Sequence, residues 1–428
     1  MLATVLVLSV LAVLPSAPDV AAVVEILERG VREEQADERL ASELAKLGPA
    51  LIPDLFSVLA SGSGLERPLR AAEETALADA LASFGSAPLR PYLGRRLSAD
   101  PPTEERLAAL RVLARVGSSE DLALVRLCLQ GSGAGIEAAL QEACTGILRR
   151  DSRALEALRR WMLERPIGIG AAIARAMRES ACPQALQALA STLGFRADLD
   201  AELLGEIAPL AARARKPVDE DVLEPIEGAL EGNDARVLRA AALALGHAQH
   251  AEALPALIAL LEHESRGVST AAEWALAHIS GLSFHADAQR WRAWLWAEQA
   301  WFERHGQRLR GELRARAAEV AIRALGELSS HRWRRHELAL TAQIALEHAD
   351  PRVRRLACTA LARLGSSAAQ PGLLQALEDA DDSVVRAARQ ALEVLGLAPP
   401  DPGPGGDTAN LGLPSRNPPS RSRRPQRA

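Results

Sequence analysis

Residues 350–365 read DPRVRRLACTALARLG, and residues 381–396, thirty-one positions later, read DDSVVRAARQALEVLG. Each copy places an aspartate before apolar residues at helical spacing and a glycine directly after them, which predicts one capped helix per copy. Such a helix cannot bury its apolar face alone and needs neighbours of the same kind. We therefore predict an all-α fold, a right-handed α-solenoid of stacked antiparallel helix pairs.

The same frame, a helix that ends in glycine, recurs along the chain. Successive glycines are 31 to 39 residues apart where neighbouring frames are both legible. After a short turn, a second apolar helix is expected, as in residues 253–261 and 371–377. Two antiparallel helices per repeat follow. The frame glycines are Gly48, Gly85, Gly117, Gly246, Gly326, Gly365 and Gly396.

These repeats resemble the HEAT-like repeats, in particular the short bacterial type of the phycobilisome lyases, whose frame reads D-x-x-V-R-x-x-A-x-x-A-L-x-x-L-G. The closest matches are residues 350–365 and 381–396, whereas 234–246 is one turn shorter and 135–230 is looser. The resemblance covers residues 37–396. It implies a solenoid that holds other molecules, and it specifies no activity, because scaffolds, adaptors and a few enzymes share the repeat.

The N-terminus predicts an exported protein. Residues 2–14 are apolar and uncharged, and small residues follow, as in a secretory signal peptide. A cut could follow Ala17 or, with Val20 at the third position before it, Ala22. We expect residues 1–22 to be a leader and the protein to lie in the periplasm or cell envelope. We expect no transmembrane segment in the mature chain, since thirteen apolar residues are too short to span a bilayer. Alternatively, the run is the first buried helix of a cytoplasmic protein.

The solenoid is expected to occupy residues 23–396, and the pattern stops at Leu397. Residues 397–428 are rich in proline, glycine and serine and have no aromatic residue, which predicts a disordered tail. The tail is either a solvated segment without a role or a contact with an anionic surface such as lipid headgroups. Two aspartates accompany five arginines there: Arg416, Arg421, Arg423, Arg424 and Arg427.

Composition argues against several classes of protein. A formal net charge of -5 provides no basic field for nucleic acid. The four cysteines show no CxxC spacing, so we expect them to pack as small apolar side chains, with a bridge between Cys128 and Cys144 possible in an exported protein. The chain contains no GxSxG, HExxH or P-loop motif. We therefore predict no enzymatic activity and no cofactor.

Four arginines lie ten residues before a frame glycine: Arg236, Arg316, Arg355 and Arg386. Stacked repeats would align them in a row. One interpretation is that they pair with loop acids such as Asp350 and Asp381 and tie successive repeats together. The other is a stripe that binds an acidic partner, which unpaired guanidiniums on a concave face would favour.

All nine histidines and six of the seven tryptophans lie between residues 247 and 348. This window contains one interruption of the repeat, residues 281–306, which resembles a Trp-rich connector of bacterial HEAT-like proteins. Trp296, beside Arg292, falls on its polar face and is a candidate partner-binding residue, or else an incidental surface residue or one covered by the next repeat. One apolar stripe is expected to face the solenoid: Trp291, Trp294, Leu295, Trp301 and Phe302.

Histidines suggest a metal site only weakly. His247 and His250 form an HxxH in a turn, but zinc needs three or four convergent ligands. Two His-Glu pairs, at 263–264 and 336–337, are similar to the four that hold the iron pair of the HEAT-repeat enzyme deoxyhypusine hydroxylase. Because only two are present, we predict no metal.

The sequence as a whole predicts a non-enzymatic scaffold that binds an unidentified protein through the ridge formed by residues 247–348. One alternative is a cofactor- or chromophore-handling enzyme that resembles the HEAT-like lyases and has a closed pocket lined by His and Trp. Another is nucleic-acid binding, as in HEAT-like DNA glycosylases, which the acidic balance and the expected export both oppose.

Overall fold

The computed structural model describes residues 20–33, 36–130, 135–214 and 218–397, and these residues contain helices and no strand. The all-α solenoid predicted above is confirmed. The chain divides into two compact units between Trp301 and Phe302. Most of the expected leader, and the tail after Leu397, lie outside the described residues.

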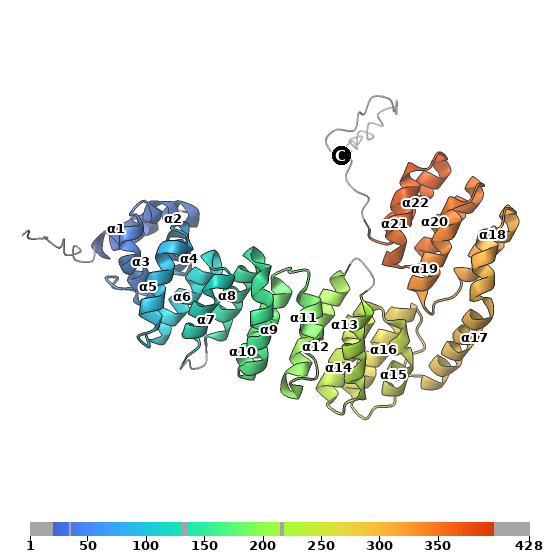
Figure 1. Ribbon diagram of the computed structural model, residues 1–428, viewed down its shortest axis with the longest axis horizontal. Coiled ribbons are helices and arrows are strands. Elements are labelled where there is room, and N and C mark those ends of the chain that lie inside the picture. Colours follow the sequence, from blue (N-terminus) through green and yellow to red (C-terminus); the bar gives the residue numbers. More distant parts are fainter. Residues whose placement is uncertain (1–19, 34–35, 131–134, 215–217, 398–428) are drawn as a thin grey trace, which may run out of the picture. The chain divides into compact units, whose positions relative to one another are not determined.

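In the first unit, the even-numbered helices stack side by side, each in contact with the next (Figure 1). They are α2 (Asp37–Ala45), α4 (Ala71–Ser83), α6 (Thr103–Val116), α8 (Glu137–Arg150), α10 (Ile167–Glu179), α12 (Ala197–Arg213), α14 (Ala235–Ala248) and α16 (Arg266–Ser280). The odd-numbered helices form the second layer. They are α3 (Ile52–Ser61), α5 (Ser86–Leu97), α7 (Leu122–Cys128), α9 (Leu155–Glu164), α11 (Ala185–Ala190), α13 (Glu220–Gly228) and α15 (Leu254–Leu260). The first helix, α1 (Val20–Arg32), packs on α2 and α3.

The second unit repeats this arrangement. Its even layer consists of α18 (Ala318–Leu328), α20 (Pro351–Leu364) and α22 (Asp382–Val394). Its odd layer consists of the second half of α17 (Ala288–Leu313), α19 (Arg335–Gln343) and α21 (Gln370–Gln375). Short 3₁₀ turns adjoin many odd helices in both units: η1 (Pro49–Leu51), η2 (Ser119–Asp121), η3 (Ser152–Ala154), η4 (Ala229–Glu231), η5 (Ala251–Ala253), η6 (Ile344–Glu347), η7 (Ser367–Ala369) and η8 (Ala376–Glu378).

Small side chains allow the even layers to stack closely. Buried alanines recur at the contacts of this layer, for example Ala241 and Ala242 on α14 and Ala271 and Ala272 on α16. At the α6–α8 contact, a Cβ atom on Gly146 would lie only 1.9 Å from the carbonyl oxygen of Ala114. Backbone therefore meets backbone there, and any larger residue would force the two helices apart.

The two repeats that define the fold have the caps that their sequences predict. The side chain of Asp350 accepts a hydrogen bond from the backbone N–H of Arg352 at 2.8 Å, and Asp381 does the same for Ser383. Gly365 and Gly396 both have φ of +67°, a left-handed conformation that favours glycine at a helix end. The frames at 350–365 and 381–396 therefore begin and end where expected.

Two frame glycines do not end their helices. Gly246 lies inside α14, which continues to Ala248, and Gly326 lies inside α18. The left-handed position after α14 is taken by Gln249, whose φ is +57°. Gly246 is needed for a close contact between helices, because a Cβ atom there would lie 2.6 Å from the ring of Trp274. Since α14 ends at Ala248 and not before Gly246, the expected repeat register is wrong by one turn at this position.

Successive repeats are joined by ion pairs between a helix and the next loop. Arg354 on α20 donates two hydrogen bonds to Asp379, at 2.7 and 2.8 Å, and both side chains are largely buried. These bonds lower the pKa of the Asp379 carboxyl. In the first unit, Arg90 on α5 donates to Asp121 at 2.7 Å. Loop acids do tie repeats together, although through arginines other than those expected.

The expected connector at 281–306 contains most of one long helix. Gly281 ends α16 in a left-handed conformation, and α17 then runs past Gly306 to Leu313. Along the expected apolar stripe, Trp291 and Leu295 are buried, whereas Trp294, Trp301 and Phe302 are half-buried. The Trp291 indole N–H donates to the backbone carbonyl of His285 at 2.9 Å. The stripe faces the solenoid at its N-terminal end and is only partly covered beyond it.

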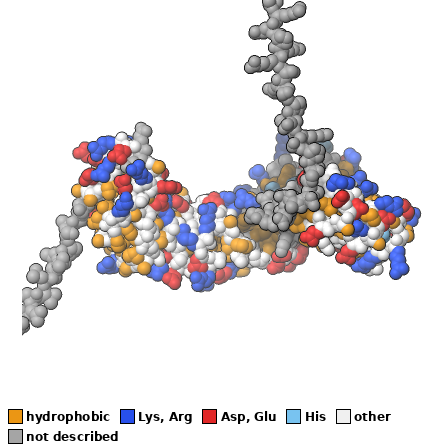
Figure 2. All heavy atoms as spheres, turned by 90° about the horizontal axis from the view of Figure 1, so that it is seen from above, with side chains coloured by type: hydrophobic (Ala, Val, Ile, Leu, Met, Phe, Trp, Pro, Cys, Tyr) orange, Lys and Arg blue, Asp and Glu red, His pale blue; other side chains and the backbone are white. Residues whose placement is uncertain are grey.

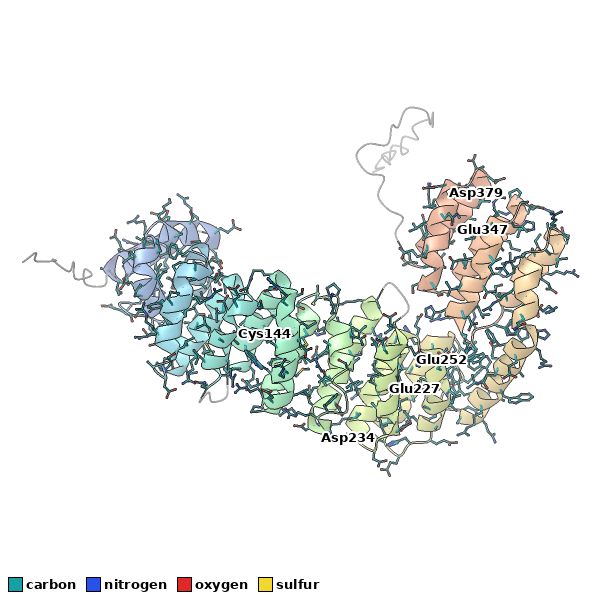
Figure 3. The ribbon with its side chains drawn as sticks, in the orientation of Figure 1. Cys144, Glu227, Asp234, Glu252, Glu347 and Asp379 are labelled. Atoms are coloured by element: carbon teal, nitrogen blue, oxygen red, sulfur yellow. The ribbon has the colours of Figure 1, made fainter. Side chains whose placement is uncertain are left out.

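All four cysteines are buried as free thiols, and Figure 3 labels one of them, Cys144 on α8. Burial raises the pKa of the Cys128, Cys144 and Cys358 thiols to about 12. All four occupy buried positions, as expected for small apolar side chains, and the Cys182 thiol also donates a hydrogen bond to the side-chain oxygen of Gln184 at 3.2 Å. Among the described helices, none alone is long and apolar enough to cross a membrane. The stretches Asp37–Ala45 and Pro49–Ser61 meet that test only together, across a bend of 99°.

We predict that Gln249→Gly increases the free energy of unfolding by about 0.5–1 kcal/mol, because it relieves a left-handed conformation that disfavours side chains. The reverse change at the equivalent position, Gly365→Gln, should decrease it by a similar amount. Urea denaturation of the full chain measures both. A decrease for Gln249→Gly would show that its side chain contributes more than the backbone conformation costs.

Candidate functional site

Arg355 on α20 and Arg386 on α22 occupy the same position of successive repeats, five residues after the capping aspartate. Both side chains are exposed, and neither makes an ion pair or a side-chain hydrogen bond with any described residue. The same holds for Arg363, two turns further along α20, and for Arg323 on the neighbouring helix α18. We refer to Arg323, Arg355, Arg363 and Arg386 as the arginine face.

Neighbouring arginines on the same helix have a different environment. Arg352 pairs with the capping carboxylate of Asp350 at 2.9 Å and with Glu319 at 3.3 Å. Asp350 is thus occupied by Arg352, and Asp381 accepts hydrogen bonds from Ser383. The expected pairing of Arg355 and Arg386 with these loop acids is therefore absent from the described part of the chain.

The expected row of four arginines is shorter than the sequence suggested. Arg236 follows its capping aspartate by two residues and pairs with Asp234 at 3.1 Å, so its counterpart is Arg352. Arg316 lies in the link between α17 and α18. The true counterpart of Arg355 in α14 is Arg239, which follows its capping aspartate by the same five residues. The frame glycines give a different alignment because two of them lie inside helices.

Trp296 is the most exposed large apolar side chain of α17, with 72% of its surface accessible. One turn earlier, Arg292 donates two hydrogen bonds to the carboxylate of Glu262, at 2.7 and 3.2 Å, and lowers the pKa of that carboxyl. The ion pair joins α17 to the end of α15. It leaves the indole of Trp296 uncovered on the polar side of the helix.

His247 and His250 contact different neighbours. His250 is buried, and its Nε2 lies 3.0 Å from Glu227, while its Nδ1 lies 3.5 Å from Glu252. Figure 3 labels these two carboxylates and Asp234, the capping residue of α14. The imidazole joins the end of α13 to the turn after α14. The contact between His250 and Glu227 is a hydrogen bond between helices.

His247 belongs to an aromatic cluster. Its ring lies 4.7 Å from that of Trp274 and 5.9 Å from that of His278, between centroids, and Trp274 stacks on His278. His247 and His278 are thirty-one residues apart, the repeat length seen at the C-terminus, so successive repeats bring them together. Burial lowers the pKa of His247, which favours the neutral ring at this contact.

The two His-Glu pairs lie in different units and have separate partners. His263 accepts a hydrogen bond from the backbone of Ser265, and His336 lies 2.6 Å from the hydroxyl of Ser366. Within the residues that the structure describes, no three His, Cys, Asp or Glu side chains are grouped as metal ligands.

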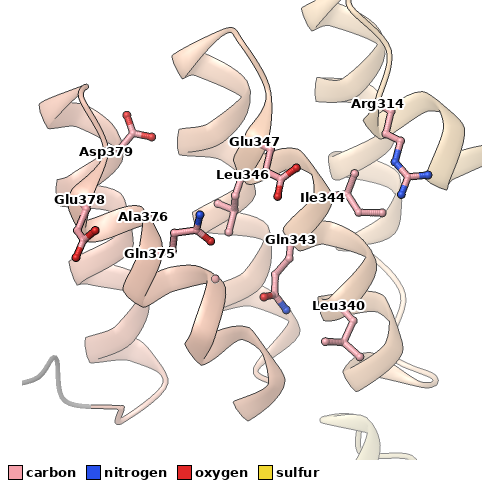
Figure 4. A pocket seen from close by; sticks show the side chains of 11 residues that line it. Arg314, Leu340, Gln343, Ile344, Leu346, Glu347, Gln375, Ala376, Glu378 and Asp379 are labelled. Atoms are coloured by element: carbon pink, nitrogen blue, oxygen red, sulfur yellow. The ribbon is translucent and has the colours of Figure 1, made fainter.

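Two grooves flank α19 in the second unit. The larger, between α19–η6 and α21–η8, has a volume of about 560 Å³ (Figure 4). The smaller, between α17 and α19, has a volume of about 430 Å³ and includes Phe302 and Trp333 in its lining. No histidine lines either groove.

Figure 2 shows basic and acidic side chains interspersed over the visible face of the described residues, with hydrophobic side chains among them. The four residues of the arginine face come from three helices, α18, α20 and α22. The sequence pointed to two of the four members of the arginine face. It gave no sign of the grooves beside α19, because their lining residues come from helices that are far apart in the sequence.

Comparison with known proteins gives the repeat family. The family model described as HEAT repeats matches residues 222–306 and 306–393. Comparison with curated proteins found no match. Among solved structures, the crystal structure of an engineered protein is similar at 18% identity and a TM-score of 0.33, over 85% of this chain and 99% of that one. The crystal structure of Kap121p bound to Pho4p is similar at 15% identity and a TM-score of 0.26, over 84% of this chain and 48% of that one.

The matched residues include the two repeats with the predicted caps, the arginine face and the grooves beside α19. The chain therefore carries HEAT repeats over residues 222–393.

Proposed function

We propose that this protein is a non-enzymatic scaffold that binds an acidic segment of a partner protein on the arginine face. The observation that carries the proposal is the exposure of four guanidiniums without an ion-pair partner among the described residues, whereas Arg352 and Arg354 on α20 are paired. Arginine suits this task because its planar fork binds a carboxylate through two hydrogen bonds.

Stacking gives the arginine face a defined spacing. Adjacent packed helices lie about 8–10 Å apart, which is close to one turn of a polyproline II helix, three residues at about 3.1 Å each. Arg355 and Arg386 hold the same position on adjacent helices, so a segment in the polyproline II conformation with acids three residues apart could reach both. Since the packed helices already fix the backbone that carries these arginines, the scaffold loses little backbone conformational entropy on binding.

Charge reversal tests this surface. We predict that Arg355→Glu combined with Arg386→Glu weakens binding of the acidic partner roughly tenfold to a hundredfold, because each change removes an attraction and adds a repulsion. The partner is to be identified by crosslinking and mass spectrometry, and its affinity then measured by titration calorimetry against both forms of the full chain.

The matched control is Arg126→Glu combined with Arg160→Glu, two exposed arginines on α7 and α9 of the first unit. This control changes the net charge by the same amount. Equal weakening in both double variants would mean that the partner responds only to overall charge, and unchanged binding in the Arg355/Arg386 variant would remove the arginine face from the proposal.

Trp296 is proposed as a second contact for a protein partner, on the first unit. Tryptophan is enriched among the few residues that contribute most of the binding energy at interfaces, and this indole already lies exposed on a helix fixed by the Arg292–Glu262 pair. Burying it in a partner would remove a large apolar surface from water.

We predict that Trp296→Ala weakens partner binding by about 2 kcal/mol or more and leaves the melting temperature unchanged. Phe195→Ala, at another aromatic side chain that is 70% exposed, is the control and should affect neither. A lower melting temperature for Trp296→Ala would identify the side chain as part of the core.

Export also belongs to the proposal, on the support of the apolar, uncharged run at residues 2–14. We expect the protein to fractionate with the cell envelope or periplasm and its mature N-terminus to follow Ala17 or Ala22. A cut after Ala22 would remove the first three residues of α1, whereas a cut after Ala17 would leave that helix whole. Intact-mass measurement of protein from its native cells decides, and an uncut N-terminus would contradict export.

A further inference from the structure

The groove between α19 and α21 combines an apolar wall with an acidic end. On the α19 side, Leu340 is 57% exposed, and Ile344 and Leu346 continue the wall. Glu347, from the same side, and Glu378 and Asp379, from the α21 side, are among the residues that line the groove (Figure 4). One cation, Arg314, is among the lining residues.

Small residues give this groove its depth. Gly372 and Ala376 lie one turn apart on the α21 wall, and both are buried. A Cβ atom on Gly372 would lie 2.5 Å from the Gln343 side-chain oxygen and 2.9 Å from Leu346. The Gln343 amide is held in turn by a 2.9 Å hydrogen bond to the carbonyl of Ala368. The groove is therefore a fixed part of the packing between two repeats.

The charges at the acidic end are unequally compensated. Asp379 is held by both hydrogen bonds from Arg354. Glu347 and Glu378 are exposed and make no ion pair with any described residue. A ligand that brings positive charge to this end and aliphatic surface to the Leu340 wall would satisfy both halves of the groove. A volume of about 560 Å³ lies within the range of about 300–1,000 Å³ usual for ligand sites and has room for a few side chains.

We propose that this groove binds a basic polypeptide segment in which arginine or lysine alternates with aliphatic residues. The aliphatic side chains lie against Leu340 and Ile344, and the cations pair with Glu347 and Glu378. The exposed amide of Gln375 is placed to hydrogen-bond to the backbone of the segment.

The consequence is a second unit with two different faces. The arginine face lies on the even layer, and the groove lies on the odd layer. Since the two sets of residues share no member, the unit can hold an acidic segment on one layer and a basic segment on the other at the same time. This goes beyond the proposed scaffold function, because it makes the unit an adaptor between partners of opposite charge.

The test uses the full chain and a short fluorescein-labelled peptide of alternating leucine and arginine, followed by fluorescence anisotropy. We expect Glu347→Lys combined with Glu378→Lys to weaken binding roughly tenfold or more, since like charges then meet at the acidic end. Leu340→Ser should weaken binding of this peptide and leave a glycine–arginine peptide unaffected. Circular dichroism melting of each variant checks that the fold is kept.

The matched control is Glu264→Lys combined with Glu393→Lys, two exposed acids outside the groove. Equal weakening in this control, or binding of the leucine–arginine peptide that does not depend on Glu347, Glu378 and Leu340, would overturn the proposal, as would no binding at all. The Arg355/Arg386 variant must bind this peptide normally. That result separates failure of the groove from failure of the arginine face, which only the acidic partner reports.

Discussion

The close stacking of the even-numbered helices is the constraint on which the other features depend. Alanine and glycine at these contacts let neighbouring helices approach until, at Gly146, backbone meets backbone. Because the contact is so short, each even helix must repeat the position of the one before it. Outward side chains at equivalent positions then come into register, which is how Arg355 and Arg386 come to share one surface. In the odd layer of the second unit, close contact is local, as at Gly372 against Gln343, and grooves remain on both sides of α19.

Much of the fold follows from local sequence. Asp350 and Gly365 fix the two ends of α20 through local effects that are recognisable in the sequence. The Asp350 carboxylate caps free backbone N–H groups, and Gly365 tolerates a left-handed backbone. The same argument failed at Gly246, where glycine is required by the ring of Trp274 on the next helix. A glycine needed for a close contact between helices and one needed for a turn look the same in sequence, and only the packing separates them.

The candidate surfaces were less predictable for a related reason. Whether an arginine is paired depends on whether its position on the helix places it near a carboxylate. A shift of one residue is enough to change this: Arg354 is held by Asp379, whereas the next residue, Arg355, faces solvent. Trp296 was recognisable because it alone among the tryptophans of α17 falls on the polar side of the helix. The groove was not recognisable, because Leu340 and Glu378 are far apart in sequence and their proximity depends on the spacing between α19 and α21.

The burial of all four cysteines has a practical consequence. They lie in different parts of the array, in or near α7, α8, α11 and α20, and the thiols of Cys128, Cys144 and Cys358 have pKa values of about 12. A folded molecule therefore shields all four sulfurs from a thiol-specific reagent. Each sulfur becomes reactive when the helices around it separate, so the order in which the four are alkylated under mild denaturant records the order in which the repeats open.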